Sequence, residues 1–163
     1  MPNVNFRELM ETTSETVERP KSAPECWLIA VIGQSIADVT KGINETPFLM
    51  FDLTNVEPHP QNPTEINSML EVEDRRGVPL YKRLRSPYRR GLTAEFWLTP
   101  EAQYRLTDRL DAVVGGRNRS IRERVAEMTN QRVQFKVRPH RDEQGNDTGQ
   151  NIVLSDTISP ATA

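Results

Sequence analysis

The 163-residue chain contains a single cysteine, Cys26, and only two histidines, His59 and His140. One cysteine excludes an intramolecular disulfide and suggests a reducing compartment. The apolar neighbours of Cys26 favour a small buried side chain over a nucleophile. One cysteine and two histidines are also too few for a zinc ribbon or finger. We therefore expect neither a metal nor a cofactor.

Recognisable catalytic patterns are equally scarce. Gly115-Gly116-Arg117 lacks the spacing of a phosphate-binding loop and follows a predicted helix rather than a strand. Asp142, Glu143 and Asp147 resemble a weak cation loop, but an acidic hairpin turn explains them more simply. The sequence therefore indicates a protein that is not an enzyme.

Long apolar runs are missing as well. Hydrophobic residues make up 36% of the chain and the mean hydropathy is −0.64. No stretch approaches the roughly 18 apolar residues of a membrane span, and Asn3, Glu8 and Glu11 interrupt any signal-peptide pattern. We expect a cytoplasmic protein with one domain over residues 25–156. A flexible acidic tail over 1–24 and a flexible tail over 157–163 would flank it.

Acidic side chains are absent from residues 75–90, a segment that holds seven basic ones. They are Arg75, Arg76, Lys82, Arg83, Arg85, Arg89 and Arg90, with Tyr81 and Tyr88 among them. The formal net charge of −2 hides this block, because residues 1–74 carry a net −9, residues 75–138 a net +10 and residues 139–163 a net −3. Such a run is either a solvated loop or a surface for a polyanion.

Hydrophobic patterning predicts five strands. The first spans residues 26–32 and continues through 35–39 past a bend at Gly33; the others span residues 47–56, 92–98, 132–138 and 151–154. Two helices lie between the third and fourth strands, one starting at Thr99 and ending at Gly115-Gly116, the other starting at Ser120. A long basic connection, residues 57–91, separates the second and third strands.

This order is that of an OB-fold, a five-stranded, partly open Greek-key β-barrel with helices between strands three and four. Another small α+β sheet protein is the alternative. In OB-folds the outer face of strands two and three binds oligonucleotides.

Strand alternation assigns Phe48 and Trp97 to that outer face, because Leu49, Phe51 and Phe96 would fill the interior. Exposed aromatic rings beside a basic run are suited to stacking bases while cations contact the phosphates. The alternative is that Phe48 and Trp97 pack as core residues. The predicted nucleic-acid-binding residues are Phe48, Lys82, Arg83, Arg85, Tyr88, Arg89, Arg90, Trp97, Lys136 and Arg138.

Several segments resemble small bacteriophage proteins that accompany replication and recombination genes and are regarded as OB-fold single-stranded-DNA-binding proteins. The resemblance rests on the strand after Thr46-Pro47, the Leu98-Thr99-Pro100-Glu101-Ala102 helix start and the closing hairpin. It covers roughly residues 25–156. The 57–91 connection is longer and more basic than expected for that group, and residues 155–163 lack an acidic partner-recruiting tip.

The resemblance implies single-stranded DNA as the ligand, with RNA left open, in the cytoplasm of an infected host cell. It also implies further copies of the chain, or replication and recombination proteins, as partners. The alternative function is a structural or interaction β-barrel whose basic segment docks an acidic protein, or the chain's own acidic tail. Duplex binding is the weakest hypothesis, because no helix carries a basic run suited to the major groove.

Overall fold

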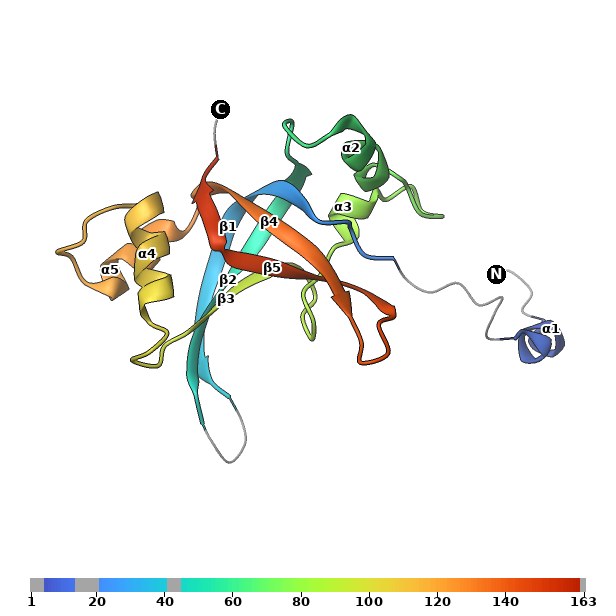
Figure 1. Ribbon diagram of the computed structural model, residues 1–163, viewed down its shortest axis with the longest axis horizontal. Helices are drawn as coiled ribbons and strands as arrows, with labels where there is room; N and C mark the ends of the chain where they lie inside the picture. Colours follow the sequence, from blue (N-terminus) through green and yellow to red (C-terminus); the bar gives the residue numbers. More distant parts are fainter. Residues whose placement is uncertain (1–4, 14–20, 41–44, 162–163) are drawn as a thin grey trace.

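The computed structural model describes residues 5–13, 21–40 and 45–161 (Figure 1). Its strands are β1 (Cys26–Val39), β2 (Pro47–Pro58), β3 (Thr93–Trp97), β4 (Arg132–Arg141) and β5 (Asp147–Pro160). Its helices are α1 (Phe6–Glu11), α2 (Thr64–Leu70), α3 (Leu80–Arg83), α4 (Tyr104–Val113) and α5 (Ile121–Met128). The predicted number and order of strands are confirmed, as are two helices between the third and fourth.

The five strands form one antiparallel sheet in the order β3-β2-β1-β4-β5. The sheet is strongly curved, and its edge strands β3 and β5 approach each other (Figure 1). Within the described residues no strand pairing joins these two edges, so the sheet remains open. The architecture is an α+β fold built on an open, curved sheet.

Strand β1 pairs with β2 on one side and with β4 on the other, and it contains a bulge. The register with β2 shifts between Ile32 and Ser35, where two residues of β1 lie opposite one of β2. Gly33 sits in this bulge, and a Cβ atom there would lie 3.2 Å from Thr54 Cγ2. The bend predicted at Gly33 is confirmed. The predicted turn between β1 and β2 falls largely on residues 41–44, outside the described residues.

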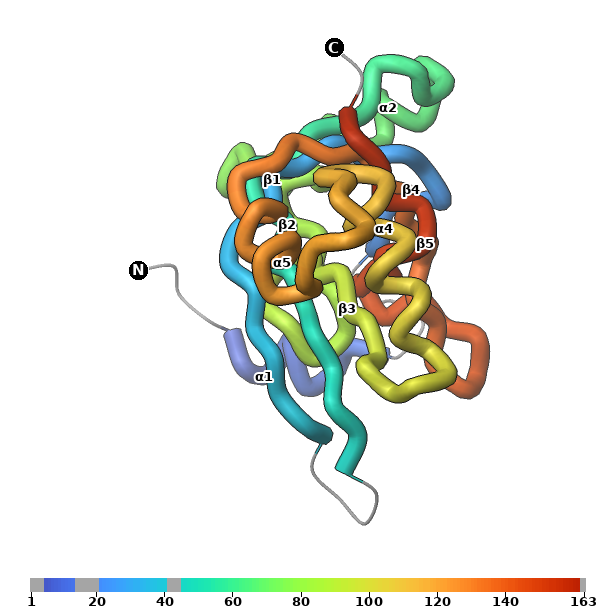
Figure 2. Tube along the Cα trace, turned by 90° about the vertical axis from the view of Figure 1, so that its left-hand side faces the viewer, coloured from blue at the N-terminus to red at the C-terminus, as the bar shows by residue number. Residues whose placement is uncertain are grey.

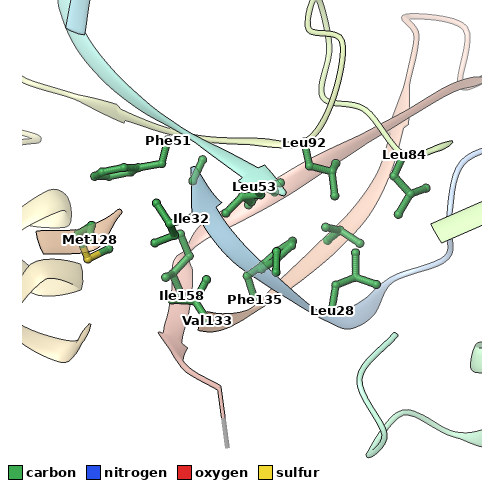
Figure 3. Close-up of a cluster of buried hydrophobic side chains, with 14 of the residues drawn as sticks. Leu28, Ile32, Phe51, Leu53, Leu84, Leu92, Met128, Val133, Phe135 and Ile158 are labelled. Carbon is green, nitrogen blue, oxygen red and sulfur yellow. The ribbon is translucent and has the colours of Figure 1, made fainter. Parts of the chain in front are cut away.

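The core fills the inside of the curved sheet. Alternate residues of the strands point inward, including Leu28, Ile32, Phe51, Leu53 and Phe135 (Figure 3). Helices α4 and α5 lie together on one side (Figure 2), where Leu106, Leu110 and Met128 join the core. The 57–91 connection contributes Leu70, Leu80 and Leu84 to the core, and Leu92 follows directly after it.

The 57–91 connection is more ordered than its sequence indicates. It contains α2 and α3, and it is tied down by a small polar network in which Asn62 is bonded to both the amide and the carbonyl of Trp27. His59 is buried and lies 3.1 Å from Gln134 Oε1. The connection has no firm hydrophobic periodicity, and side-chain hydrogen bonds together with the buried Leu70 and Leu80 hold it in place.

The predicted start of the first helix after β3 and the predicted C-terminal tail both need correction. Residues 99–103 form a turn before α4, so the helix starts at Tyr104 rather than at Thr99. The C-terminal tail predicted at 157–163 is wrong over 157–160, because these residues belong to β5 and Ile158 is buried. Residues 162–163 lie outside the described residues.

The predicted N-terminal tail extends too far into the domain. The amide and hydroxyl of Ser22 donate to Asp147 Oδ2, at 3.1 and 3.0 Å, and Ala23 is fully buried. Burial by itself would raise the pKa of Asp147, but hydrogen bonds from Gly149 and Ser22 outweigh it and lower the pKa. Residues 14–20 lie outside the described residues. In the described part of the chain, no helix has the length and apolar character needed to cross a bilayer.

Candidate nucleic-acid interface

Trp97 and Phe48 form a pair on the outer face of β2 and β3. They are directly opposite in the ladder, with ring centroids 6.2 Å apart and an interplanar angle of 71°. Trp97 is 50% exposed and Phe48 is half-buried, whereas Phe96 on the other face is 3% exposed. The predicted strand faces are confirmed, and the alternative of a core Trp97 is wrong.

A groove of about 420 Å³ opens beside this pair, at the seam between the edge strands β3 and β5. We call it the seam groove. Its volume falls within the roughly 300–1,000 Å³ of small-ligand pockets. Its lining comprises Thr40, Phe48, Ser86, Pro87, Tyr88, Arg89, Thr93, Glu95, Phe96, Trp97, Ile152, Val153 and Ser155. Phe48, Tyr88, Arg89 and Trp97, all predicted site residues, are therefore brought together in one concave surface.

Tyr88 is held in an unusual conformation. Its φ is 62°, the left-handed region that bulky side chains seldom adopt, and its side chain is 96% exposed. Burial does not compensate for this backbone strain. Non-glycine residues keep a left-handed backbone only where the surrounding structure imposes it, and such residues are concentrated at functional sites. Tyr88 thus presents a solvent-facing ring at the mouth of the seam groove.

The loop that carries Tyr88 is anchored at three places. Ser86 accepts a hydrogen bond from the Thr93 amide at 3.0 Å, and the Arg85 carbonyl accepts one from the Asn151 amide at 2.9 Å. The Leu92 carbonyl accepts one from the Leu53 amide at 3.0 Å. Residues 85–92 therefore bridge from β2 to β5 across the open seam, which positions Tyr88 and Arg89 at the groove.

Arg89 is paired with Glu95 inside the groove. Its Nε donates to Glu95 Oε1 at 3.1 Å, and its Nη2 lies 3.0 Å from the same oxygen. Arg89, which the sequence predicts to contact phosphate, is therefore paired with a carboxylate for which the sequence predicts no role. Strand alternation can place Glu95, two residues before Trp97, on the same face as the tryptophan, but its arginine partner comes from a loop and cannot be placed from the sequence.

Three other predicted basic residues make their contacts outside the seam groove. Arg83 donates to the Val78 and Val72 carbonyls and pairs with Asp74 at 3.8 Å. Lys136 Nζ lies 3.5 Å from Glu25. Lys82 lines a separate groove with Tyr81 and Arg132. These three residues are not part of the seam groove.

Arg85, Arg90 and Arg138 are exposed and have no carboxylate within ion-pair distance among the described residues. Two of them, Arg85 and Arg90, belong to the same bridging loop as Tyr88. The electrostatic contribution of the predicted cluster therefore falls mainly on these three guanidinium groups, which are unpaired and accessible to a polyanion.

Cys26 is buried in the core. Burial and the nearby charge of Glu25 raise the pKa of the Cys26 thiol to about 11, so the thiol is protonated near neutral pH. Within the residues that the structure describes, no cluster of three or more His, Cys, Asp and Glu side chains could hold a metal ion. Thr93 at the groove has a buried hydroxyl without a hydrogen-bond partner in the described structure.

Comparison of the chain with models of protein families, with curated proteins and with solved structures finds no match. The resemblance to bacteriophage single-strand-binding proteins thus stays a prediction that rests on the sequence alone.

Proposed function

We propose that this protein binds single-stranded nucleic acid, DNA in the first place, in the seam groove. The observation that carries the proposal is the gathering of three aromatic side chains, Phe48, Tyr88 and Trp97, on one groove beside a cationic loop. Trp97 is half-exposed and Tyr88 almost fully exposed, although aromatic surface is costly to leave in water. Aromatic rings in such a position are suited to stacking unpaired bases.

The mechanism divides between stacking and charge. Bases from a single strand stack on Trp97 and Tyr88, while Phe48 supports Trp97 edge-on. The phosphates lie toward the unpaired Arg85 and Arg90 on the bridging loop. A duplex is excluded because its bases are already stacked on one another and cannot reach the rings. Affinity would be salt-dependent and weakly dependent on sequence.

The strand order supports an OB-like barrel as the finer description of the fold. The spatial order β4-β1-β2-β3 is the order of a Greek key, and β3 and β5 are the strands that meet when a five-stranded OB barrel closes. The outer face of strands two and three is the face on which OB-folds bind oligonucleotides. We infer an OB-like barrel whose seam is bridged by residues 85–92 instead of by strand pairing.

The cellular setting is inferred from the sequence resemblance. It favours a cytoplasmic, non-enzymatic role in bacteriophage DNA replication or recombination, with RNA as the alternative ligand. An acidic protein partner is the competing hypothesis for the exposed arginines. It does not account for the exposed aromatic rings, so we favour the nucleic acid.

Substitution of the two exposed rings tests the proposal. Trp97→Ala should weaken binding of a fluorescent single-stranded oligonucleotide about 5- to 150-fold, the equivalent of about 1–3 kcal/mol for one stacked base. Tyr88→Gly should weaken it similarly while leaving stability unchanged or raised, because glycine adopts a φ of 62° without strain. Anisotropy titrations and denaturant melts on the same samples provide both readouts.

Two controls separate stacking from packing. Tyr104 is 55% exposed and does not line the seam groove, so Tyr104→Ala should leave affinity unchanged. Phe96→Ala should cost about 3–5 kcal/mol of stability, since it empties a buried aromatic site. Binding that survives both Trp97→Ala and Tyr88→Gly would contradict the proposal.

A further inference from the structure

Glu95 is a carboxylate in a groove that is otherwise suited to a polyanion. It projects from the same side of β3 as Trp97 and lines the seam groove with Phe48 and Tyr88. Its charge offsets that of Arg89, so the ion pair gives the groove interior no net positive charge with which to attract phosphates. The interior of the groove is therefore suited to the uncharged part of a nucleotide, the base, while the phosphates remain near Arg85 and Arg90.

The position of the carboxylate is fixed by Arg89. Both contacts from the guanidinium, Nε at 3.1 Å and Nη2 at 3.0 Å, go to Oε1. Among the described residues, Oε2 accepts no hydrogen bond. Arg89 thus acts as a positioning residue, and one carboxylate oxygen retains its full capacity to accept hydrogen bonds from a ligand.

A carboxylate beside stacked bases discriminates among them. Cytosine, adenine and guanine present exocyclic amino groups, which donate to a carboxylate; the pairing of Glu or Asp with the cytosine N4 amine is a recurrent one. Thymine and uracil present only one N–H, and it lies between two carbonyl oxygens that a carboxylate repels. An acceptor fixed next to Trp97 therefore favours bases with an amino group.

We propose that Glu95 is a base-specificity determinant, which makes the seam groove select amino-bearing bases, cytosine among the pyrimidines, over thymine and uracil. The inference rests on the proposed function and deepens it. It assigns Glu95 to base contact and Arg89 to holding Glu95 in place.

Oligo-dC and oligo-dT of about 15 nucleotides provide the test, since both are pyrimidine strands with little self-stacking and each can span a site of OB-fold size. The wild-type protein should bind oligo-dC about five- to tenfold more tightly, the lower part of the range for a good side-chain–base contact because Glu95 is half-exposed. Glu95→Gln should reduce the preference to less than about twofold, since an amide donates as well as accepts. It should also bind oligo-dT more tightly than wild type, since it removes the repelling charge.

Glu101→Gln is the matched control. Glu101 is exposed, precedes α4 and does not line the seam groove, so this variant should keep the wild-type preference. Equal affinity of the wild type for both strands, or an unchanged preference in Glu95→Gln, would overturn the specificity role and leave the proposed function intact. Failure of the wild type to bind either strand would overturn the proposed function itself and the inference with it.

Discussion

Thr93 and Thr157 each carry a side-chain hydroxyl, but the two hydroxyls differ in their hydrogen bonding. The Thr93 hydroxyl is buried without a partner in the described structure, whereas Thr157 accepts from the Lys136 amide at 2.8 Å and donates to the Leu154 carbonyl at 2.6 Å. A buried polar group without a hydrogen bond costs roughly 1–3 kcal/mol, and an apolar replacement of the same shape relieves that cost.

We therefore expect valine substitutions at these two positions to have effects of opposite sign. Thr93→Val should raise the free energy of unfolding by about 1 kcal/mol, because it removes an unpaired hydroxyl. Thr157→Val should lower it by about 1–3 kcal/mol, because it leaves the Lys136 amide without its acceptor. Denaturant unfolding measures both. A loss of stability in Thr93→Val as large as that in Thr157→Val would show that the Thr93 hydroxyl is paired in solution.

For single residues, strand alternation in the sequence predicts which side chains face outward. The sequence does not predict the conformation or the contacts of loop residues. The outward orientation of Trp97 follows from the apolar residues on either side of it. The left-handed backbone of Tyr88 and the pairing of Arg89 with Glu95 do not follow from any local pattern, because residues 85–92 take their shape from anchors on β2 and β5.

Among the elements, β5 is the one that organises the groove. Its Asn151 is completely buried and hydrogen-bonds both ways with Ala23, accepting from the amide at 3.0 Å and donating to the carbonyl at 2.9 Å. The side chain also donates to the Arg138 carbonyl, and the backbone amide of Asn151 donates to the Arg85 carbonyl. Asn151 thus connects the segment before β1, strand β4 and the bridging loop.

Asn151→Ala should lower the free energy of unfolding by about 2–3 kcal/mol, because the Ala23 amide and carbonyl would be buried without partners. Asn118→Ala is the control: Asn118 is exposed, so its loss should change stability by less than about 0.5 kcal/mol. Chemical denaturation of the two variants decides the point. Equal stability of both would mean that the Asn151 bonds do not hold the entry segment and the loop together.

Element order was predictable from the sequence, and element ends were not. Ser120 caps α5 as predicted, accepting from the Glu123 amide at 3.2 Å, because a capping box is a purely local signal. The extension of β5 to Pro160 depends on pairing with Val133 and Gln134 of β4, a tertiary contact with no local signature. The short helices α2 and α3 have no clear apolar periodicity in the sequence, although Leu70 and Leu80 anchor them in the core.

For the whole molecule, the charge distribution matters more than the net charge. The net charge of −2 conceals the positive segment over residues 75–138. Ion pairs within the fold reduce the positive charge that is available to a ligand. Arg83, Arg89 and Lys136 are paired with Asp74, Glu95 and Glu25. Sequence counting identified the basic block correctly and overstated its free charge, because it cannot show which cations have partners. Apart from Lys82, which lines another groove, the predicted binding cations without a carboxylate partner in the described structure are Arg85, Arg90 and Arg138.

The salt dependence of single-strand binding tests the central claim most directly. Each phosphate contact contributes about −0.7 to the slope of log affinity against log salt for a single strand. Three contacts predict a slope of about −2 between about 50 and 200 mM salt, and Arg85→Ala/Arg90→Ala should reduce it to about −0.7. A duplex of the same length should bind much more weakly than the single strand. A slope near zero in the wild-type protein, or a duplex that binds as tightly as the single strand, would contradict the account.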